Sequence, residues 1–259
     1  MTYELIGGYV HTLFLDMLGQ SHLLIAGASG SGKSVLVNGL ICTALHYSPF
    51  DIPNGKQLIL IDPKRTELHP YRRTPHCLRY ATEPEDMVDA LHYAIGITEQ
   101  RYKRMNKEGW RTYRGGDIYV IIEELADLMT TRRREVQPLI QRLCQIARAA
   151  RIHLVAVTQC PLVAVIPTPI KCNFDGIVAL RTRSAQDSRN IIGVKGAELL
   201  PRYGECLYLT PDRVQIEHCK IPYINEQEQE RVVRWWTEQV DRQKPSARKG
   251  FLGWLLGKG

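Results

Sequence analysis

Short apolar runs recur along the chain between Ser21 and Cys219, and the segments between them carry apolar residues at helical spacing. Runs that are apolar on both faces are typical of strands in the middle of a parallel sheet. The runs are rich in Leu and β-branched residues and cover Leu23–Ile25, Leu58–Ile61, Ile118–Ile122, Ile152–Val157 and Ile177–Leu180.

Three of the intervening segments are predicted to be helices, namely Ser34–Tyr47, Thr82–Arg104 and Glu135–Ala150. The second begins with Thr82 and Glu85, which have the spacing of a capping box. Because strand and helix alternate, we predict an α/β fold with a mainly parallel central sheet flanked by helices.

The C-terminal part has a different pattern. Glu205–Leu209 and Val214–Ile221 flank Thr210-Pro211-Asp212, which predicts an antiparallel hairpin on the sheet edge. Asn225 and Glu228 then have capping spacing for a helix that runs to about Gln243. We expect one domain over 1–243, followed by a basic, Gly-rich flexible tail over 244–259.

Composition and charge narrow the class of protein. The 259 residues are 44% hydrophobic and 24% charged, as in a soluble globular protein, and the net charge of +7 favours a polyanionic partner without requiring one. Seven cysteines without a CxxC pair fit a reduced, cytoplasmic compartment better than a disulfide framework. No apolar run reaches the roughly 18 residues of a membrane span, and the first residues do not resemble a secretion signal.

A phosphate-binding motif follows the first run. The residues from Gly27 to Ser34 match G-x-x-x-x-G-K-[ST] at every fixed position. Such a loop points successive backbone N–H groups at phosphate oxygens, its lysine reaches the β- and γ-phosphates, and its serine ligates Mg²⁺. A chance match in a glycine-rich turn is the alternative, which the flanking strand and helix disfavour. The predicted nucleotide-binding residues are Gly27, Ala28, Ser29, Gly30, Ser31, Gly32, Lys33, Ser34 and Val35.

A second motif supplies two carboxylates. The run Ile118–Ile122 leads directly into Glu123 and Glu124, which is the Walker B arrangement. We expect Glu123 to hold the magnesium shell and Glu124 to polarise the attacking water. The alternative is a pair of acids that stabilises a helix start through the helix dipole.

Two further side chains are weaker candidates. Gln159 follows the run Ile152–Val157 and could sense the γ-phosphate, or could be an ordinary loop residue. Arg148 lies near the end of a predicted helix, where an arginine is favourable in any case, but it could also reach a neighbouring subunit's nucleotide. The guanine-recognition element Asn-Lys-x-Asp is incomplete at Asn106-Lys107-Glu108-Gly109, which favours ATP over GTP.

Several separated motifs, in order, resemble the motor domain of the FtsK/SpoIIIE family of double-stranded DNA translocases. The resemblance covers roughly Asp16 to Ile221. Besides the P-loop, it is carried by Leu60-Ile61-Asp62-Pro63-Lys64 with Glu67-Leu68, Glu99-Gln100-Arg101-Tyr102 with Met105, Glu123-Glu124-Leu125-Ala126-Asp127-Leu128, Ile146 to Leu154 with Thr158-Gln159, Asp187-Ser188-Arg189, and Gly196-Ala197-Glu198-Leu199-Leu200.

This resemblance implies a RecA-like P-loop ATPase that binds ATP and Mg²⁺ and assembles as a hexameric ring around duplex DNA. Arg148 matches the family's trans-acting arginine, and Arg189 could instead, or additionally, face the neighbouring site. The resemblance also implies modules that we do not find in this sequence: a membrane-spanning N-terminus, a linker with an α domain, and a winged helix. The chain therefore looks like a stripped motor of a mobile element, plasmid or phage.

Three positions depart from the family pattern. Glu123 replaces the usual aspartate, Arg151 replaces a glycine, and Cys160 replaces an arginine. These departures bear on the rate of hydrolysis and on its coupling to DNA. The changes at Glu123 and Cys160 suggest one alternative function, an ATP-binding regulatory module with little turnover. A second alternative, which the same site would serve, is a conjugative coupling ATPase that partners a relaxase.

Contacts with DNA are expected through phosphates, because nothing in the sequence indicates readout of base edges. A solvated cationic surface is the alternative for each basic side chain. The candidates are Arg132, Arg133, Arg134, Lys171, Arg181 and Arg183. The apolar end of the tail, Phe251–Leu256, could dock on a membrane or a partner, but it is short enough that disorder is the favoured interpretation.

Overall fold

A computed structural model of the chain describes residues 2–6, 9–13, 21–46, 55–159, 167–209, 216–221 and 223–243. Its strands form one ten-stranded sheet in the order β2-β1-β10-β9-β8-β3-β7-β6-β4-β5. The strands are β1 (Thr2–Ile6), β2 (Tyr9–Leu13), β3 (His22–Ala26), β4 (Gln57–Ile61), β5 (Cys77–Ala81), β6 (Ile118–Ile122), β7 (Ile152–Thr158), β8 (Gly176–Leu180), β9 (Glu205–Leu209) and β10 (Glu217–Lys220).

The sheet has a parallel half and an antiparallel half. The six neighbours from β8 to β5 are all parallel, as the apolar runs predicted. The remaining strands pair antiparallel, beginning with β9 against β8. Because all parallel strands point the same way, the segments that follow β3, β4, β6, β7 and β8 emerge at one edge of the sheet, its carboxyl edge.

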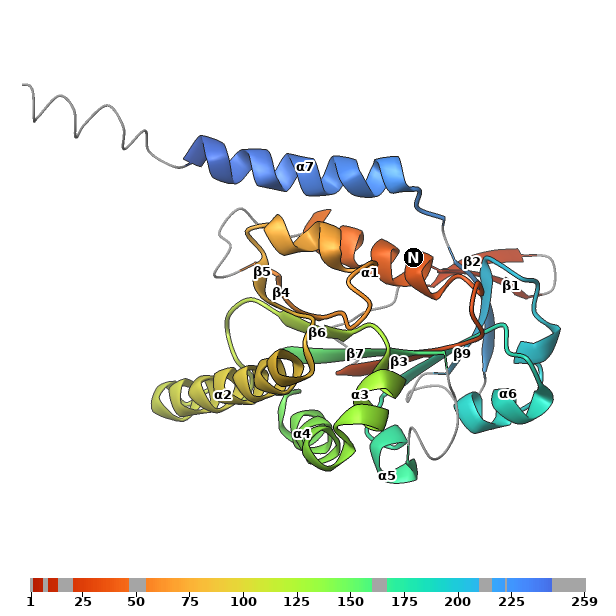
Figure 1. Ribbon diagram of the computed structural model, residues 1–259, viewed down its shortest axis with the longest axis horizontal. Coiled ribbons are helices and arrows are strands. Elements are labelled where there is room, and N and C mark those ends of the chain that lie inside the picture. The colour runs from red at the N-terminus through yellow and green to blue at the C-terminus, as the bar shows by residue number, and fades with distance from the viewer. Residues whose placement is uncertain are drawn as a thin grey trace, which may run out of the picture.

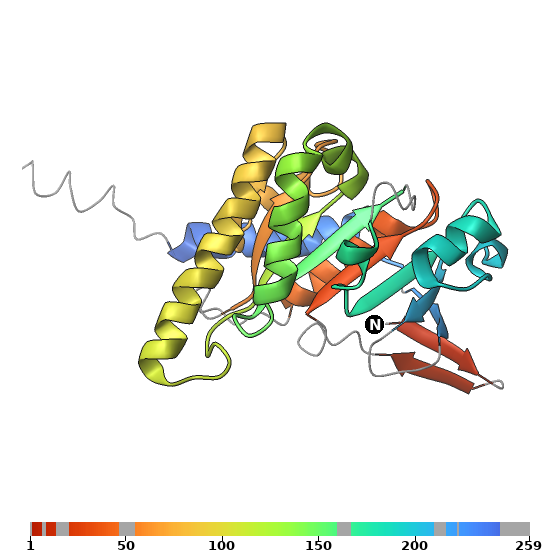
Figure 2. The ribbon, with the colours of Figure 1, turned by 90° about the horizontal axis from the view of Figure 1, so that it is seen from below.

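Helices cover both faces of the parallel half (Figure 1). On one face lie α1 (Lys33–His46) and α7 (Glu226–Gln243), and Figure 2 shows the opposite face from below. That opposite face carries α2 (Pro84–Glu108), α3 (Leu125–Thr131), α4 (Arg133–Ile146), α5 (Thr168–Lys171) and α6 (Ala185–Ile192).

Alternate residues of each central strand enter two separate cores. Leu24 and Ala26 of β3 pack with the helices α2 and α4, whereas Leu23 and Ile25 pack with α1 and with Trp236 of α7. This explains why the strands read as continuous apolar runs. The two cores hold the carboxyl edge of the sheet rigid, which is where the predicted site lies.

The predicted hairpin is confirmed as the antiparallel pair β9 and β10, but its place on the sheet edge is wrong. Two N-terminal strands, β1 and β2, add beyond β10 and form the edge. The short helices α3, α5 and α6 and the edge strand β5 were also not predicted. The turn 210–215 and the tail expected over 244–259 lie outside the described residues.

The ends of two helices differ from the prediction. The second predicted helix begins at Pro84 and not at Thr82, because a proline at the first helical position forces the preceding Glu83 into an extended conformation (φ −88°, ψ 150°). It ends at Glu108, where Gly109 takes the left-handed conformation that caps helices. The helix predicted to reach Ala150 ends instead at Ile146.

The capping box predicted for the last helix is confirmed. The Glu228 N–H donates to the Asn225 side-chain oxygen at 2.8 Å, and the Asn225 N–H donates to the Glu228 carboxylate at 3.0 Å. Two orphan N–H groups at the start of α7 are thereby satisfied.

Candidate nucleotide-hydrolysis site

The P-loop occupies the carboxyl edge of the sheet, between the ends of β3 and α1. Its backbone is fixed to the two neighbouring strands, because the Gly27 N–H donates to the Thr158 carbonyl at 3.3 Å and the Ala28 N–H to the Arg181 carbonyl at 2.8 Å. Gly30 (φ +71°) and Gly32 (φ +99°) have the left-handed conformations that favour glycine. The loop therefore has the curled backbone and the helix start that bind phosphate.

Lys33 lies folded over its own loop. Its buried ammonium donates to the Gly27 carbonyl at 2.9 Å and to the Ala28 carbonyl at 2.8 Å. Burial lowers the pKa of Lys33 to about 8, against the opposing charges of Glu124 and Glu123. The two carboxylates are therefore close enough to the P-loop for their charges to act on its lysine.

Glu124 is held from three sides. One carboxylate oxygen accepts hydrogen bonds from the Thr158 hydroxyl at 3.2 Å and from the Gln159 N–H at 3.1 Å. The other lies 3.1 Å from the Lys64 ammonium. The backbone of Glu124 (φ +145°, ψ 76°) is in a region that costs a non-glycine residue about 1–3 kcal/mol. Such strain at a buried, fully oriented carboxylate is typical of a functional position.

Glu123 differs from Glu124 in having a buried carboxylate oxygen that no described residue contacts by a hydrogen bond. Burial raises the pKa of Glu123 to about 7, and the carboxylates of Glu67 and Asp62 add to the rise. One oxygen of Glu123 and one of Asp62 are buried without a hydrogen-bond partner among the described residues. This excess of buried carboxylate oxygen, whose charge acts on the pKa of Lys33, is an environment that a divalent cation would neutralise.

The donor set fits magnesium in particular. In the described part of the chain, no three His, Cys, Asp or Glu side chains form a ready-made metal cluster. Magnesium does not need one, since it usually keeps several waters and binds one or two protein oxygens together with substrate phosphates. Ser34 and Glu123 stay the residues predicted to provide those oxygens.

Gln159 and Arg148 have different positions from those of the two acids. The exposed Gln159 side chain lies at the carboxyl edge beside Glu124, which it contacts through its backbone. Arg148 lies in the turn 147–150 that precedes β7, so it is at the amino edge of the sheet and roughly 20 Å from the P-loop. Arg189 is exposed on α6. Neither the turn nor its arginine touches this chain's own P-loop.

Two of the basic residues predicted to contact DNA lie beside the P-loop. Arg181 and Arg183 line a cavity of about 420 Å³ together with Arg202, Glu198 and the loop residues from Ala28 to Ser31. Their positive charge therefore lies beside the loop that is predicted to bind the nucleotide phosphates.

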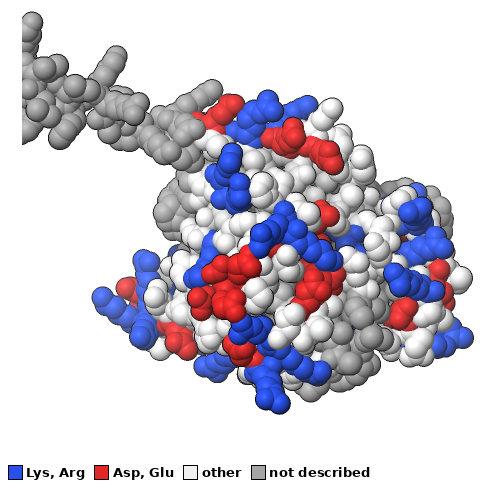
Figure 3. All heavy atoms as spheres, viewed as in Figure 1, with Lys and Arg blue, Asp and Glu red and all other residues white. Residues whose placement is uncertain are grey.

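The other basic candidates divide into paired and exposed groups. Arg132 forms ion pairs with Glu85 and Glu135, and the Lys171 ammonium donates to the Asn190 carbonyl at 2.8 Å. Arg133 and Arg134 are exposed on α4. Figure 3 shows basic and acidic side chains interspersed on the face that it views, and not a continuous basic field.

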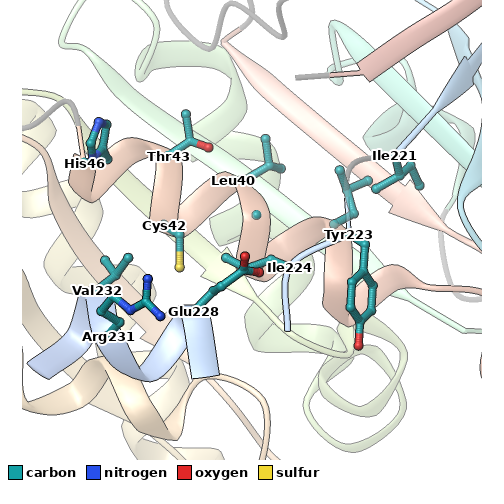
Figure 4. Close-up of a pocket in the computed structure, with 12 residues that line it drawn as sticks. Leu40, Cys42, Thr43, His46, Ile221, Tyr223, Ile224, Glu228, Arg231 and Val232 are labelled. Atoms are coloured by element: carbon teal, nitrogen blue, oxygen red, sulfur yellow. The ribbon is translucent and has the colours of Figure 1, made fainter. Parts of the chain in front are cut away.

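A second cavity lies between α1 and α7 (Figure 4). It has a volume of about 460 Å³ and a largely apolar lining that includes Leu40, Ile221 and Ile224. Neither the loop 27–34 nor the acids 123 and 124 line it. It is therefore separate from the hydrolysis site.

Three residues of the site were missed as functional by the sequence analysis. Lys64 and Asp62 follow β4, and Thr158 ends β7, so all three emerge at the carboxyl edge beside Glu124. The signal was a polar or charged residue directly after an apolar run. It needs the strand order β7-β6-β4 to become informative, and that order is set by tertiary packing.

Comparison with known proteins decides the family. The sequence model of the FtsK/SpoIIIE family matches residues 4–118 and 115–163, which together are more than half of the chain. The chain belongs to the FtsK/SpoIIIE family. Its fold and site are those of a P-loop ATPase.

Relatives in this family are named DNA translocase FtsK. The one from Chlorobaculum tepidum is 37% identical over 250 residues, and that from Rhizobium meliloti is 34% identical over 278. These alignments cover 89% and 90% of this chain but only 30% and 31% of the relatives. The chain thus spans less than a third of the length of these proteins.

Solved structures with the same fold include the pCW3 conjugation coupling protein TcpA with ATPgS, which has a TM-score of 0.77 and 19% identity. The alignment covers 91% of this FtsK/SpoIIIE chain and 70% of that one. EssC (ATPases 2 and 3) from Geobacillus thermodenitrificans has a TM-score of 0.72 and 16% identity, over 92% of this chain and 46% of that one. At these identities the likeness establishes the fold.

One departure from the FtsK/SpoIIIE pattern now has a structural explanation. Arg151 stands where the family resemblance predicts glycine, and its φ of +56° is a conformation that favours glycine. The guanidinium forms a bidentate pair with the buried Asp117, with both contacts at 2.8 Å. This pair offsets the backbone cost. Cys160, a second departure, lies outside the described residues.

Among the described helices, none combines the length and the hydropathy that a membrane span requires.

Proposed function

We propose that this chain is the motor of a double-stranded DNA translocase, which hydrolyses ATP at the P-loop site and couples the cycle to movement along DNA. The observation that supports this proposal is the position and hydrogen bonding of the Glu124 carboxylate. This buried carboxylate is oriented by Thr158 and Gln159 and acts electrostatically on Lys33, in a chain whose relatives are named DNA translocases.

Each residue of the site would have its own role in ATP hydrolysis. The loop from Gly27 to Val35 would hold the phosphates, through backbone N–H groups other than those of Gly27 and Ala28, which donate to neighbouring strands. Lys33 would exchange its two carbonyl partners for the β- and γ-phosphates. Glu124 orients the attacking water and accepts its proton. The exposed side chain of Gln159, whose backbone N–H contacts Glu124, would sense the γ-phosphate.

Ser34 and Glu123 would hold magnesium. When bound, the ion neutralises negative charge on the phosphates. The longer arm of Glu123, compared with the aspartate that the resemblance predicts, brings its carboxylate to the ion either directly or through a bound water.

We further propose that the chain works in the cytoplasm as a homo-oligomeric ring, hexameric as the family resemblance implies, with duplex DNA in its centre. Arg148 supports this, because it is exposed at the edge of the sheet opposite to its own P-loop. An arginine in that place can stabilise charge on a γ-phosphate only in another subunit. Heterologous contacts of this kind generate a ring when the rotation between subunits closes.

Displacement of a third strand tests translocation directly. Linear duplex DNA carries a triplex-forming oligonucleotide at one end, and release of that oligonucleotide is followed after ATP is added. The proposal expects release with the native chain and none with Lys33→Ala, which removes the P-loop ammonium. Equal release by both proteins would refute it.

Two alternatives make different predictions. A conjugative coupling ATPase, for which the TcpA likeness gives only the fold, would bind a relaxase or a relaxase–DNA complex in a pull-down. A regulatory ATP-binding module would hydrolyse ATP slowly, at a rate that neither Glu124→Gln nor DNA changes.

A further inference from the structure

Hydrogen bonds hold the turn that carries Arg148 along its whole length. Each of the six backbone carbonyls from Ile146 to Arg151 has a donor, and the donors come from three separate parts of the chain. From α2, the Tyr102 hydroxyl donates to the carbonyl of Ile146 (2.9 Å), and the Arg101 guanidinium donates to those of Ala150 (2.7 Å) and Arg151 (3.2 Å). From the start of β6 and the segment before it, the Tyr113 N–H donates to Ala149 (2.8 Å) and the Ile118 N–H to Arg151 (3.1 Å). Within the turn and the start of β7, the Ile152 N–H donates to Ala147 (3.1 Å) and the Arg151 N–H to Arg148 (3.0 Å).

Arg101 is the centre of this arrangement. It is 7% exposed and lies on α2, whose C-terminal half returns to the amino edge of the sheet. One guanidinium nitrogen donates to the carbonyls of Ala150 and Arg151, and the guanidinium lies 4.3 Å from the centre of the Tyr113 ring. The charge-assisted hydrogen bonds of this buried guanidinium fix the positions of both the guanidinium and the backbone carbonyls that accept from it.

The side chain of Arg148 has the opposite character. It is exposed, and within the described part of the chain it has no hydrogen bond or ion pair. The low pKa of His22, at the start of β3, has burial as its main cause, and the charge of Arg148 contributes to it, in agreement with a position at the amino edge. A rigid backbone thus presents a free guanidinium to whatever lies beyond this edge.

We propose that Arg101, assisted by Tyr102, is a positioning residue for Arg148: it fixes the 146–151 turn so that Arg148 meets a neighbouring subunit's nucleotide in one orientation. This inference rests on the trans role of Arg148 under the proposed function. Preorganised charge is effective in catalysis because no reorganisation is needed during the reaction, and misplacement by about 1 Å can cost a large part of the rate.

The primary test is Arg101→Lys in the oligomeric protein with DNA. An ammonium cannot reproduce the fork of the guanidinium, so turnover is expected to fall about tenfold while the ATP affinity of the P-loop stays the same. Arg104→Lys is the matched control, because Arg104 is exposed on the same helix and is expected to keep full turnover. Tyr102→Phe removes only the hydroxyl bond to Ile146 and gives a milder loss, which keeps the test informative if Arg101→Lys is unstable.

Mixed oligomers separate positioning from a merely structural effect. A subunit with Lys33→Ala still offers an intact Arg148, and a subunit with Arg101→Lys still offers an intact P-loop. Random equal mixing gives roughly a quarter of the interfaces both intact parts. We therefore expect turnover to rise when Arg101→Lys is mixed with Lys33→Ala, and also when Arg148→Ala is mixed with Lys33→Ala. Mixing Arg101→Lys with Arg148→Ala should give no such rise, because no interface then has an intact, correctly positioned Arg148.

Failure of the positioning role of Arg101 and failure of the trans role of Arg148 give different results. Recovery by Arg148→Ala but not by Arg101→Lys, or full turnover of Arg101→Lys alone, overturns the positioning role and leaves the trans role intact. Full turnover of Arg148→Ala alone, or no recovery when it is mixed with Lys33→Ala, overturns the trans role and this inference together.

Discussion

The Lys64 ammonium lies 3.1 Å from a carboxylate oxygen of Glu124, so the ends of β4 and β6 are joined across the hydrolysis site. Partial burial lowers the pKa of Lys64, but the hydrogen bond and charge of Glu124 outweigh this and raise it. The pair leaves the other Glu124 oxygen to Thr158 and Gln159. Lys64 therefore sets the direction in which the carboxylate points.

Replacing Lys64 should slow hydrolysis without preventing nucleotide binding. In Lys64→Met the carboxylate loses one of its three partners, and we expect kcat to fall about tenfold while KM for ATP changes little. Lys64→Arg, which keeps a cation at this place, should retain most of the rate. Steady-state ATPase assays check both variants, and a loss confined to KM would contradict this role.

Arg151→Gly should destabilise the fold although it relieves an unfavourable φ. Relief of the left-handed conformation is worth about 1 kcal/mol, but two charge-assisted hydrogen bonds to the buried Asp117 are lost, for a net cost of about 1–2 kcal/mol. Arg65→Gly is the matched control, because Arg65 also has a positive φ (58°) but pairs with Glu83 at an exposed place. Urea unfolding should show a lower midpoint for Arg151→Gly only.

His22 should make the protein less stable in mild acid. Burial lowers the pKa of His22 from its ordinary 6.5 to about 4, and the opposing charge of Asp175 does not restore it. As the pH falls below 6.5 the unfolded chain takes up this proton before the folded one does, so the free energy of unfolding decreases until pH 4, by about 3 kcal/mol.

The variant His22→Asn removes this titration while an amide oxygen can still accept from the Leu154 N–H. Its stability should therefore change less between pH 6.5 and 4 than that of the native chain, as urea unfolding at several pH values would show. His92→Asn, at an exposed place on α2, should keep the native pH dependence. Parallel pH curves for the native chain and His22→Asn would exclude this role of His22.

The arginines beside the P-loop and those on α4 should affect different ligands. Arg183→Ala removes a positive charge from the cavity next to Ala28–Ser31, so we expect weaker ATP binding and unchanged DNA binding. Arg134→Ala is expected to leave ATP binding intact and to lower the salt dependence of DNA affinity by about one unit of slope. Titrations with a fluorescent nucleotide and a labelled duplex at several salt concentrations distinguish the two.

The parallel core and the P-loop could be predicted from the sequence because their signals are local. Strands such as Ile118–Ile122 are apolar on both faces, and the loop needs glycine at fixed positions. The partners of Glu124 could not be predicted. Lys64 is 60 residues away in the sequence, and only the placement of β4 beside β6 brings the two side chains together.

Helix ends were harder to predict because competing signals lie within a few residues of each other. The capping pattern of Thr82 was overruled by Pro84, whereas the same pattern at Asn225 met no competitor. The predicted position of Arg148 depended on where the helix α4 ends. It was expected near the end of a helix but lies in the turn after α4, which allows Arg101 to hold the backbone around it.

The ATPase rate with and without linear duplex DNA, measured at low salt for the native chain and for Glu124→Gln, tests the central claim most directly. The account predicts that DNA raises the native rate and that Glu124→Gln loses turnover by about a hundredfold or more while still binding ATP. Glu108→Gln, an exposed change on α2, should behave as the native chain does. A native rate that DNA leaves unchanged, or a Glu124→Gln protein that hydrolyses ATP normally, would contradict it.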